Sequence, residues 1–147
     1  MMTDKPTILL IDDNVSLVLG FARVLQNAGY IVHTAYTAAE GLRLAALHRP
    51  DAIVLDFQMP LINGAGFLYR LRELATLRHT PVMILTGMVI NDEQRDEFAA
   101  LRAIVRFKPI GPREFLAETA RMVTRPMAAP AWAPAGVAER QDATPSD

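Results

Sequence analysis

The segment that decides the fold spans residues 52–64 and has the sequence Ala-Ile-Val-Leu-Asp-Phe-Gln-Met-Pro-Leu-Ile-Asn-Gly. Its first four residues carry no charge, which is typical of a parallel strand that is buried on both faces. The strand ends in a carboxylate, Asp56, and Met59, Pro60 and Gly64 then begin a new segment. A carboxylate at the C-terminal end of such a strand lies where open α/β sheets bind their ligands. Asp56 is therefore the first candidate for chemistry.

Apolar patterns on either side of this strand alternate between strand and helix type. Strands are predicted over 7–11, 30–35, 82–85 and 103–107, and helices over 14–28, 37–47 and 64–75, from Asn91 onwards and from Pro112 onwards. Five strand–helix pairs in alternation predict a doubly wound α/β fold of the flavodoxin-like (βα)5 type. Its parallel sheet is expected to have the strand order 2-1-3-4-5, with helices on both faces.

The third predicted helix carries an apolar stripe that we interpret as its inward face, formed by Phe67, Leu68, Leu71 and Leu74. Arginines also occur along this segment. Because Glu73 interrupts them, we interpret them as a solvated face, formed by Arg70, Arg72 and Arg78.

Composition limits the domain organisation. A chain of 147 residues with 51% hydrophobic content is expected to form one folded unit, placed here at residues 1–125. Residues 126–147 are rich in alanine and proline without an apolar period, which predicts a disordered tail. Trp132 within it is either an anchor for a partner or an incidental residue.

Charge and cysteine content exclude several classes of function. Fifteen basic and sixteen acidic residues give a net charge of -1 with no basic stripe, so direct nucleic-acid binding is not expected. The absence of cysteine excludes disulfides, thiolate metal sites and a cysteine nucleophile. The apolar run near the N-terminus, Ile8–Ile11, is too short for a signal peptide or a membrane span. We therefore expect a cytoplasmic protein without membrane association.

Polar side chains follow four of the five predicted strands at the point where each strand ends. These residues are Asp12 and Asp13, Asp56, Thr86 and Lys108. Each one alone is compatible with a turn, a helix cap or a solvated strand end. In the order 2-1-3-4-5, however, the four strands are neighbours, so the five side chains converge on one crevice. Together they predict a functional site.

The charges of this set indicate its chemistry. Three neighbouring carboxylates repel one another and raise at least one pKa unless a cation lies between them. The oxygen ligands suit Mg²⁺. A phosphoryl acceptor explains the remaining groups, because Asp56 can attack phosphorus while Lys108 neutralises a phosphoryl oxygen and the Thr86 hydroxyl donates to another.

At this point the sequence resembles the receiver domains of two-component response regulators. The resemblance spans Pro6 to about Met122. Five separate motifs carry it in the family's order: Leu-Ile-Asp-Asp-Asn at 10–14, Leu-Asp-Phe-Gln-Met-Pro at 55–60, Asn-Gly at 63–64, Leu-Thr-Gly at 85–87 and Lys-Pro-Ile at 108–110.

The resemblance implies roles for the acidic residues. Asp56 would be the phosphoacceptor, taking its phosphoryl group from a phosphohistidine of a sensor histidine kinase or a histidine phosphotransfer protein. Asp13, Asp56 and the main-chain carbonyl of Gln58 would bind Mg²⁺, and Asp12 would act through a metal-bound water.

Thr86 and Lys108 would hold the phosphoryl group, and the Lys108–Pro109 bond would be cis. The family usually carries a tyrosine or phenylalanine three residues before the lysine as a rotamer switch. Val105 occupies that position here. The nearest aromatic residue, Phe107, is expected on the opposite face of the strand, so the usual switch is not expected. Any response to phosphorylation of the face formed by the fourth helix, fifth strand and fifth helix would then use a mechanism other than this rotamer switch.

Two further positions are expected to tune the lifetime of the phosphorylated state. Gln58 and Met88 stand where the family's residues flank the water's route to the phosphoaspartate. A long amide and an apolar thioether are expected to hinder that water, which predicts slow self-dephosphorylation.

We therefore expect a single-domain response regulator that signals by phosphorylation-dependent protein binding or by phosphorelay, with a homodimer left open. It is not expected to be an enzyme beyond self-catalysed phosphoryl transfer and autodephosphorylation. A degenerate receiver that binds or dimerises without phosphorylation is the alternative, which Val105 favours and the complete acid, threonine and lysine set opposes. A phosphotransferase or phosphatase with an aspartyl-phosphate intermediate typically needs a second acid where Gln58 stands.

Overall fold

The computed structural model describes residues 5–56 and 64–124, and all structural statements below concern these residues. The strands are β1 (Thr7–Ile11), β2 (Ile31–Ala35), β3 (Ala52–Asp56), β4 (Val82–Thr86) and β5 (Ala103–Phe107). The helices are α1 (Val15–Asn27), α2 (Ala38–His48), α3 (Gly64–Glu73), α4 (Asp92–Ala100) and α5 (Pro112–Thr124), with a short 3-10 turn, η1, at Ala75–Leu77. Gln58, Trp132 and the predicted tail over 126–147 lie outside the described residues.

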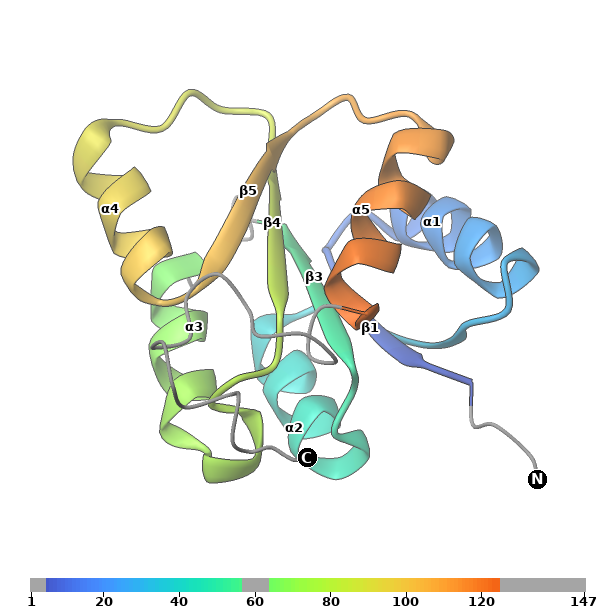
Figure 1. The fold of residues 1–147 in the computed structure, drawn as a ribbon, viewed down its shortest axis with the longest axis horizontal. Coiled ribbons are helices and arrows are strands. Elements are labelled where there is room, and N and C mark those ends of the chain that lie inside the picture. The colour runs from blue at the N-terminus through green and yellow to red at the C-terminus, as the bar shows by residue number, and fades with distance from the viewer. Residues whose placement is uncertain (1–4, 57–63, 125–147) are drawn as a thin grey trace, which may run out of the picture.

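The five strands form one parallel sheet in the order β2-β1-β3-β4-β5, which confirms the predicted fold class and strand order. Helices α1 and α5 cover one face, and α2, α3 and α4 cover the other (Figure 1). The strand order places the carboxyl ends of β1, β3, β4 and β5 side by side. Polar residues that follow these strands are thereby brought to one edge of the sheet.

Two apolar cores lie on the two faces of the sheet. Along β1, Leu9 and Ile11 join the core under α2–α4, whereas Ile8 and Leu10 join the core under α1 and α5, as the twofold period of a strand requires. All residues of β3 and β4 are buried because helices cover both of their faces. This burial explains the uncharged sequence that identified β3.

Side-chain caps begin the helices largely where the sequence places them. Thr37 accepts a hydrogen bond from the Glu40 N–H, but the Glu40 carboxylate accepts from the Tyr36 N–H, so α2 has only half of a capping box. A full capping box begins α4, where Asn91 and Gln94 accept from each other's N–H groups.

The third helix ends earlier than its apolar pattern predicts. Helix α3 stops at Glu73, and the chain continues into η1 after Leu74, which is 38% exposed. The prediction that Leu74 faces inward is therefore wrong, although Phe67, Leu68 and Leu71 are buried. Leu77 of η1 is fully buried in the same core.

The interpretation of Arg72 as a solvated residue is also wrong. Its guanidinium donates to the carbonyl oxygens of Leu77 at 2.9 Å, Thr80 at 2.7 Å, Leu101 at 3.0 Å and Arg102 at 3.3 Å. Burial, and then the nearby Arg102 charge, lower the pKa of Arg72 to about 10. The side chain therefore joins α3 to the segment before β4 and to the end of α4. At the C-terminal end of α4 it supplies donors to the Leu101 and Arg102 carbonyls.

Among the described helices, none combines the length and the apolar character needed to cross a lipid bilayer.

The close approach of α2 to β1 gives a first prediction. A Cβ atom on Gly41 would lie 2.5 Å from Cδ1 and 3.0 Å from Cγ1 of the buried Ile11 side chain. We expect Gly41→Ala to lower the free energy of unfolding by about 1–3 kcal/mol, because overpacking outweighs the gain in helix propensity. Urea denaturation followed by circular dichroism measures this change.

The matched control is Gly20→Ala in α1, where a Cβ would meet no atom within 4 Å. That substitution should raise the free energy of unfolding by roughly 0.5–1 kcal/mol. Equal stabilisation by both substitutions would contradict the close contact at Gly41.

Candidate functional site

The end of β1 supplies two carboxylates to the carboxyl edge of the sheet. Asp12 is buried, with 8% exposure, and Asp13 is exposed. The Asp12 N–H donates to the Ala35 carbonyl at 3.1 Å, which extends the pairing of β1 with β2 by one residue. Oδ1 of Asp12 accepts from the Asn14 N–H at 2.9 Å. The Asp12 side chain is thus fixed at the start of the turn into α1.

Asp56 is the last residue of β3 and has 6% exposure. Asp12, Asp13 and Asp56 each offer one carboxylate oxygen that lies within 4.8 Å of the oxygens offered by the other two. Residues separated by more than forty positions in the sequence are brought together because β1 and β3 are neighbours in the sheet. The predicted convergence of the three carboxylates is confirmed by this geometry.

Lys108 reaches the carboxylates from the far edge of the sheet. Its Nζ lies 3.4 Å from Oδ1 of Asp56 and 3.5 Å from Oδ2 of Asp12. The Lys108 N–H donates to the Thr86 carbonyl at 2.8 Å, and the Lys108–Pro109 peptide is cis, as predicted. One ammonium group therefore bridges both buried acids.

Thr86 ends β4 and is fully buried. Its Oγ1 accepts a hydrogen bond from the Met88 N–H at 3.0 Å. A hydroxyl is both donor and acceptor, so this bond leaves the Thr86 hydroxyl hydrogen available to donate. The four strand ends thus bring together three carboxylates, one ammonium and one hydroxyl.

Burial is the main cause of the shifted titration of Asp12. It raises the pKa of the carboxyl group from 3.8 to about 6, the Asn14 N–H lowers it, and the neighbouring Asp56 raises it against the opposing effect of Lys108. A small cavity of about 10 Å³ beneath Asp12 and Asp56 is lined in part by Val18 and Phe21 of α1. This apolar lining is consistent with the desolvation. Phe21 was not among the predicted site residues, although it lies one helical turn from Val18.

The donor set fits a hard divalent cation. Among the described residues, the ligand atoms that converge at the site are carboxylate oxygens, and Mg²⁺ usually takes one or two carboxylates and keeps several waters. A cation there would also relieve the repulsion between Asp12 and Asp56. The predicted carbonyl ligand, Gln58, lies outside the described residues.

The alternation of β5 corrects the expectation for Phe107. Val105 packs against the core under α2–α4, whereas Ile104 packs against the core under α1 and α5, and Arg106 bonds to Glu118 of α5. Residues two apart in a strand share a face, so Phe107 lies on the same face as Val105 rather than the opposite one. Phe107 is 47% exposed and pairs in register with Thr86.

A comparison with known families agrees with this arrangement. Residues 8–120 match the model of the response regulator receiver domain. The chain belongs to the response regulator receiver family. The matched range begins in β1 and ends in α5, so it includes every strand that contributes to the site.

Individual receivers show the same relationship. The chain is 30% identical over 111 residues to the polar-differentiation response regulator DivK of Brucella anthropi, covering 75% of this chain and 89% of that protein. The chemotaxis protein CheY4 of Vibrio cholerae superposes with a TM-score of 0.76 at 31% identity, covering 81% of this chain and 99% of that one. Both proteins are response regulators by name, and the sequence-based recognition of the family is confirmed.

Longer relatives also match. The transcriptional regulatory protein PrrA of Mycobacterium tuberculosis is 36% identical over 90 residues, which is 61% of this chain. The aligned part spans 38% of the length of PrrA.

The raised pKa of Asp12 gives a prediction for the metal-free receiver. The folded chain holds this proton up to about pH 6, whereas the unfolded chain releases it near the ordinary value of 3.8. Between these pH values the folded state binds more protons, so rising pH removes stability. With a chelator present, we compare the free energy of unfolding of the unsubstituted chain with that of Asp12→Asn. As the pH rises from about 4 to about 6, the value for the unsubstituted chain should fall relative to the variant by something on the order of 1–2 kcal/mol.

Urea titrations at pH 4, 5, 6 and 7 measure this difference. The control is Gly20→Ala in α1, which changes no titratable group and meets no atom within 4 Å. Its difference from the unsubstituted chain should stay constant over the same range. Parallel curves for the unsubstituted chain and Asp12→Asn would contradict the burial of this carboxylate.

Proposed function

We propose that this receiver accepts a phosphoryl group on Asp56 from a phosphohistidine of a sensor histidine kinase or a histidine phosphotransfer protein. The observation that supports the proposal most strongly is the bridging of Asp12 and Asp56 by Lys108 at the carboxyl edge of the sheet. An ammonium beside the nucleophile stabilises negative charge that arrives with the phosphoryl group. The buried Thr86 hydroxyl lies at the end of the neighbouring strand.

In the proposed reaction a carboxylate oxygen of Asp56 forms a bond to phosphorus while the nitrogen–phosphorus bond of the phosphohistidine breaks. The imidazole leaves with the bonding electron pair and takes up a proton. Mg²⁺, held by Asp13, Asp56 and the main-chain carbonyl of Gln58, with Asp12 acting through water, would supply charge neutralisation for the phosphoryl oxygens. Lys108 would neutralise one phosphoryl oxygen and Thr86 would donate a hydrogen bond to another.

The new charge provides a means of signalling. A phosphoryl group adds about -1.5 to -2 charges and three acceptor oxygens beside Lys108 and Thr86. A shift of Thr86 acts on β5, because the Lys108 N–H is bonded to the Thr86 carbonyl and Phe107 pairs with Thr86. The face formed by α4, β5 and α5 would thereby change its affinity for a downstream protein or a relay partner.

The proposal extends to the location, the partners and the catalytic activity of the receiver. The receiver acts as a phosphoacceptor in the cytoplasm, with protein partners rather than nucleic acid or membrane. Its own catalysis is limited to self-phosphorylation and autodephosphorylation. The net charge of -1 and the absence of a basic stripe in the sequence support protein partners, and a homodimer is compatible with the proposal.

A second candidate is a degenerate receiver that binds or dimerises without phosphorylation. Val105 at the usual aromatic position supports it, because a partly buried β-branched side chain packed against the core has few rotamers to switch between. The two candidates differ in whether Asp56 takes up a phosphoryl group.

Intact mass spectrometry tests the proposal directly. Incubation with a small-molecule phosphodonor and Mg²⁺ should add the mass of one phosphoryl group, because Asp56 is the activated nucleophile. Asp56→Asn and a sample with chelator are the controls, and the added mass should vanish in both.

Absence of the added mass, together with absence of Mg²⁺ binding, would contradict the proposal and favour the degenerate receiver. An added mass that persists in Asp56→Asn would place the modification on another residue.

The lifetime of the phosphorylated state tests the roles of Gln58 and Met88. We expect loss of the phosphoryl group over minutes or longer, because an amide and a thioether flank the water's route. Met88→Ala should speed this loss roughly several-fold by admitting water, whereas Val89→Ala, at the exposed neighbouring position, should leave it unchanged. Time-resolved intact mass after removal of the phosphodonor measures the half-life. A half-life of only seconds in the unsubstituted receiver would contradict the prediction.

A further inference from the structure

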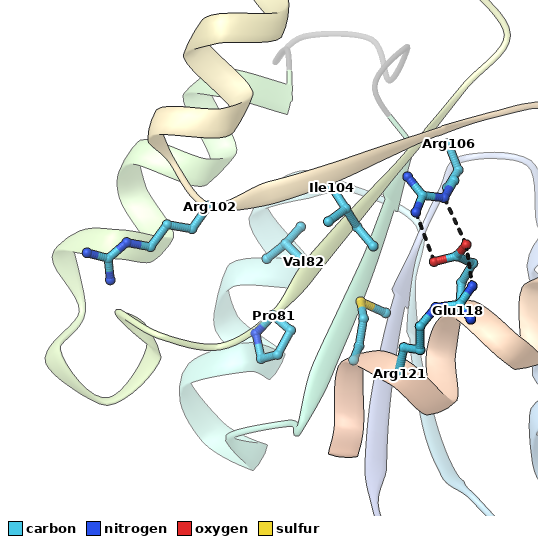
Figure 2. A pocket seen from close by; sticks show the side chains of 8 residues that line it. Pro81, Val82, Arg102, Ile104, Arg106, Glu118 and Arg121 are labelled. Carbon is cyan, nitrogen blue, oxygen red and sulfur yellow. Dashed lines mark hydrogen bonds and ion pairs between the residues drawn. The ribbon is translucent and has the colours of Figure 1, made fainter. Parts of the chain in front are cut away.

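The two edge strands of the sheet, β5 and β2, contact their neighbouring helices through different chemistry. At β5, Nε of Arg106 lies 3.0 Å from Oε2 of Glu118 on α5, and both residues are drawn in Figure 2. An arginine and an ionised carboxylate keep their charges throughout the neutral pH range. At β2, the contact with α2 joins His33 to His48. Histidine has an ordinary pKa of about 6.5, so this second contact can change its charge near neutral pH.

The alternation of β2 and the period of α2 bring the two histidines together. Val32 packs in the core under α1 and α5, whereas Ala35 packs in the core under α2–α4. Residues two apart in a strand share a face, so His33 lies on the side of α2. His48 is the last residue of α2 and follows the buried Ala45 by three positions, which places it on the helix face that covers the sheet. The two rings stack with centroids 3.8 Å apart and planes inclined by 9°.

The elements packed against β2 bring few other charges to this pair. Strand β1 has no charged residue. The charged residue of α1, Arg23, belongs to the helix that covers the opposite face of the sheet. Besides His48, α2 carries Glu40 and Arg43, which lie 4.0 Å from each other.

The chain that follows α2 carries Arg49 and Asp51. The Asp51 carboxylate accepts a hydrogen bond from the Thr7 N–H at 2.7 Å. The pKa of His33 is lowered by burial and then by the charge of His48. The two histidines therefore act mainly on each other.

Protonation changes the energy of the stack in two steps. Rings that carry one proton between them can remain stacked, and the C-terminal end of α2 stabilises a positive charge on His48. A second proton places two positive charges about 4 Å apart, which repel each other. His33 is half-buried, so its charged form also loses hydration while the stack is closed. Both effects disappear if the rings separate and water reaches His33.

We propose that His33 and His48 form an acid-sensitive contact that holds the last turn of α2 against β2 at neutral pH and releases it when both imidazoles are protonated. The closed contact binds the second proton more weakly than the open one. It is therefore most stable above about pH 6.5 and loses stability as the pH falls below that value. Because α2 ends where the chain turns back into β3, the contact lies away from the carboxyl ends of the strands. It does not require phosphorylation of Asp56.

Nuclear magnetic resonance titration of the histidine Cε1–H signals tests the coupling on the full chain. The chain has three histidines, and His→Gln variants assign their signals. His33 should titrate below the ordinary value, and His48→Gln should raise its proton affinity about fivefold, since the repulsion of a charge about 4 Å away is lost. The control is His79→Gln, which removes a histidine bonded to Arg102. That variant should leave the titration of His33 unchanged.

Amide hydrogen exchange measures the release itself. The Arg49 N–H donates to the Ala45 carbonyl at 2.9 Å and closes the last turn of α2. After correction for the intrinsic exchange rate, its protection should fall at least about fivefold between about pH 7.5 and pH 5.5. The fall should persist in His79→Gln. It should be absent in His33→Phe, whose ring can stack but takes up no proton, and in His48→Phe, which makes the same change at an exposed position.

Three results would overturn the proposal. Equal titration of His33 in the unsubstituted chain and in His48→Gln would show that the two rings are not coupled. A loss of Arg49 protection that persists in both phenylalanine variants would assign the acid response to another group. A nuclear Overhauser effect between the two rings that persists below both titration midpoints would show that the stack stays closed when doubly protonated.

Discussion

The ion pair between Lys108 and two buried carboxylates connects the far edge of the sheet to its centre. Nζ of Lys108 contacts Asp56 of β3 and Asp12 after β1, although Lys108 itself follows β5. The contact exists because β1, β3, β4 and β5 are neighbours whose carboxyl ends align. Two desolvated acids side by side are unfavourable without a cation, so the ammonium stabilises the arrangement that brings the strand ends together. The acidic site and the sheet are thus one structural unit.

The contacts of β5 differ between the two faces of the sheet. On the α4 side, β5 presents Val105 packed against the core and Phe107 exposed, and Phe107 pairs in register with Thr86. On the α5 side, Arg106 fixes β5 to Glu118 by two parallel bonds. Charge-assisted hydrogen bonds therefore hold β5 on its α5 side, whereas the aromatic side chain at the end of the strand is exposed on the α4 side.

Arginines lie beside the amino ends of β4 and β5, whereas the acidic site lies at the carboxyl ends of the strands. Arg72 donates to four main-chain carbonyl oxygens there, and Arg102 follows the end of α4 with a left-handed backbone at φ 66°. Main-chain carbonyls accept hydrogen bonds without neutralising a charge, so the bonds of Arg72 fix its position and leave its charge in place. The acidic site thus lies at one end of these strands, and the largely buried Arg72 lies at the other.

The sequence by itself determined the element order and the five polar residues at the strand ends, because buried parallel strands require uninterrupted apolar runs and the chain becomes polar where they stop. The strand order was expected from the common doubly wound topology, and the structure confirms it. It failed where a side chain's surroundings come from distant segments. Leu74 and Arg72 follow a helical pattern, yet the helix ends before Leu74, and Arg72 binds carbonyls of η1, α4 and the chain between them. The twofold period of a strand is sufficient to place Phe107 on the same face as Val105. The pairing of Arg106 with Glu118, in contrast, depends on how α5 packs against β5. Only the tertiary structure decided these contacts, since the energy of burying a charge depends on partners that the local sequence does not contain.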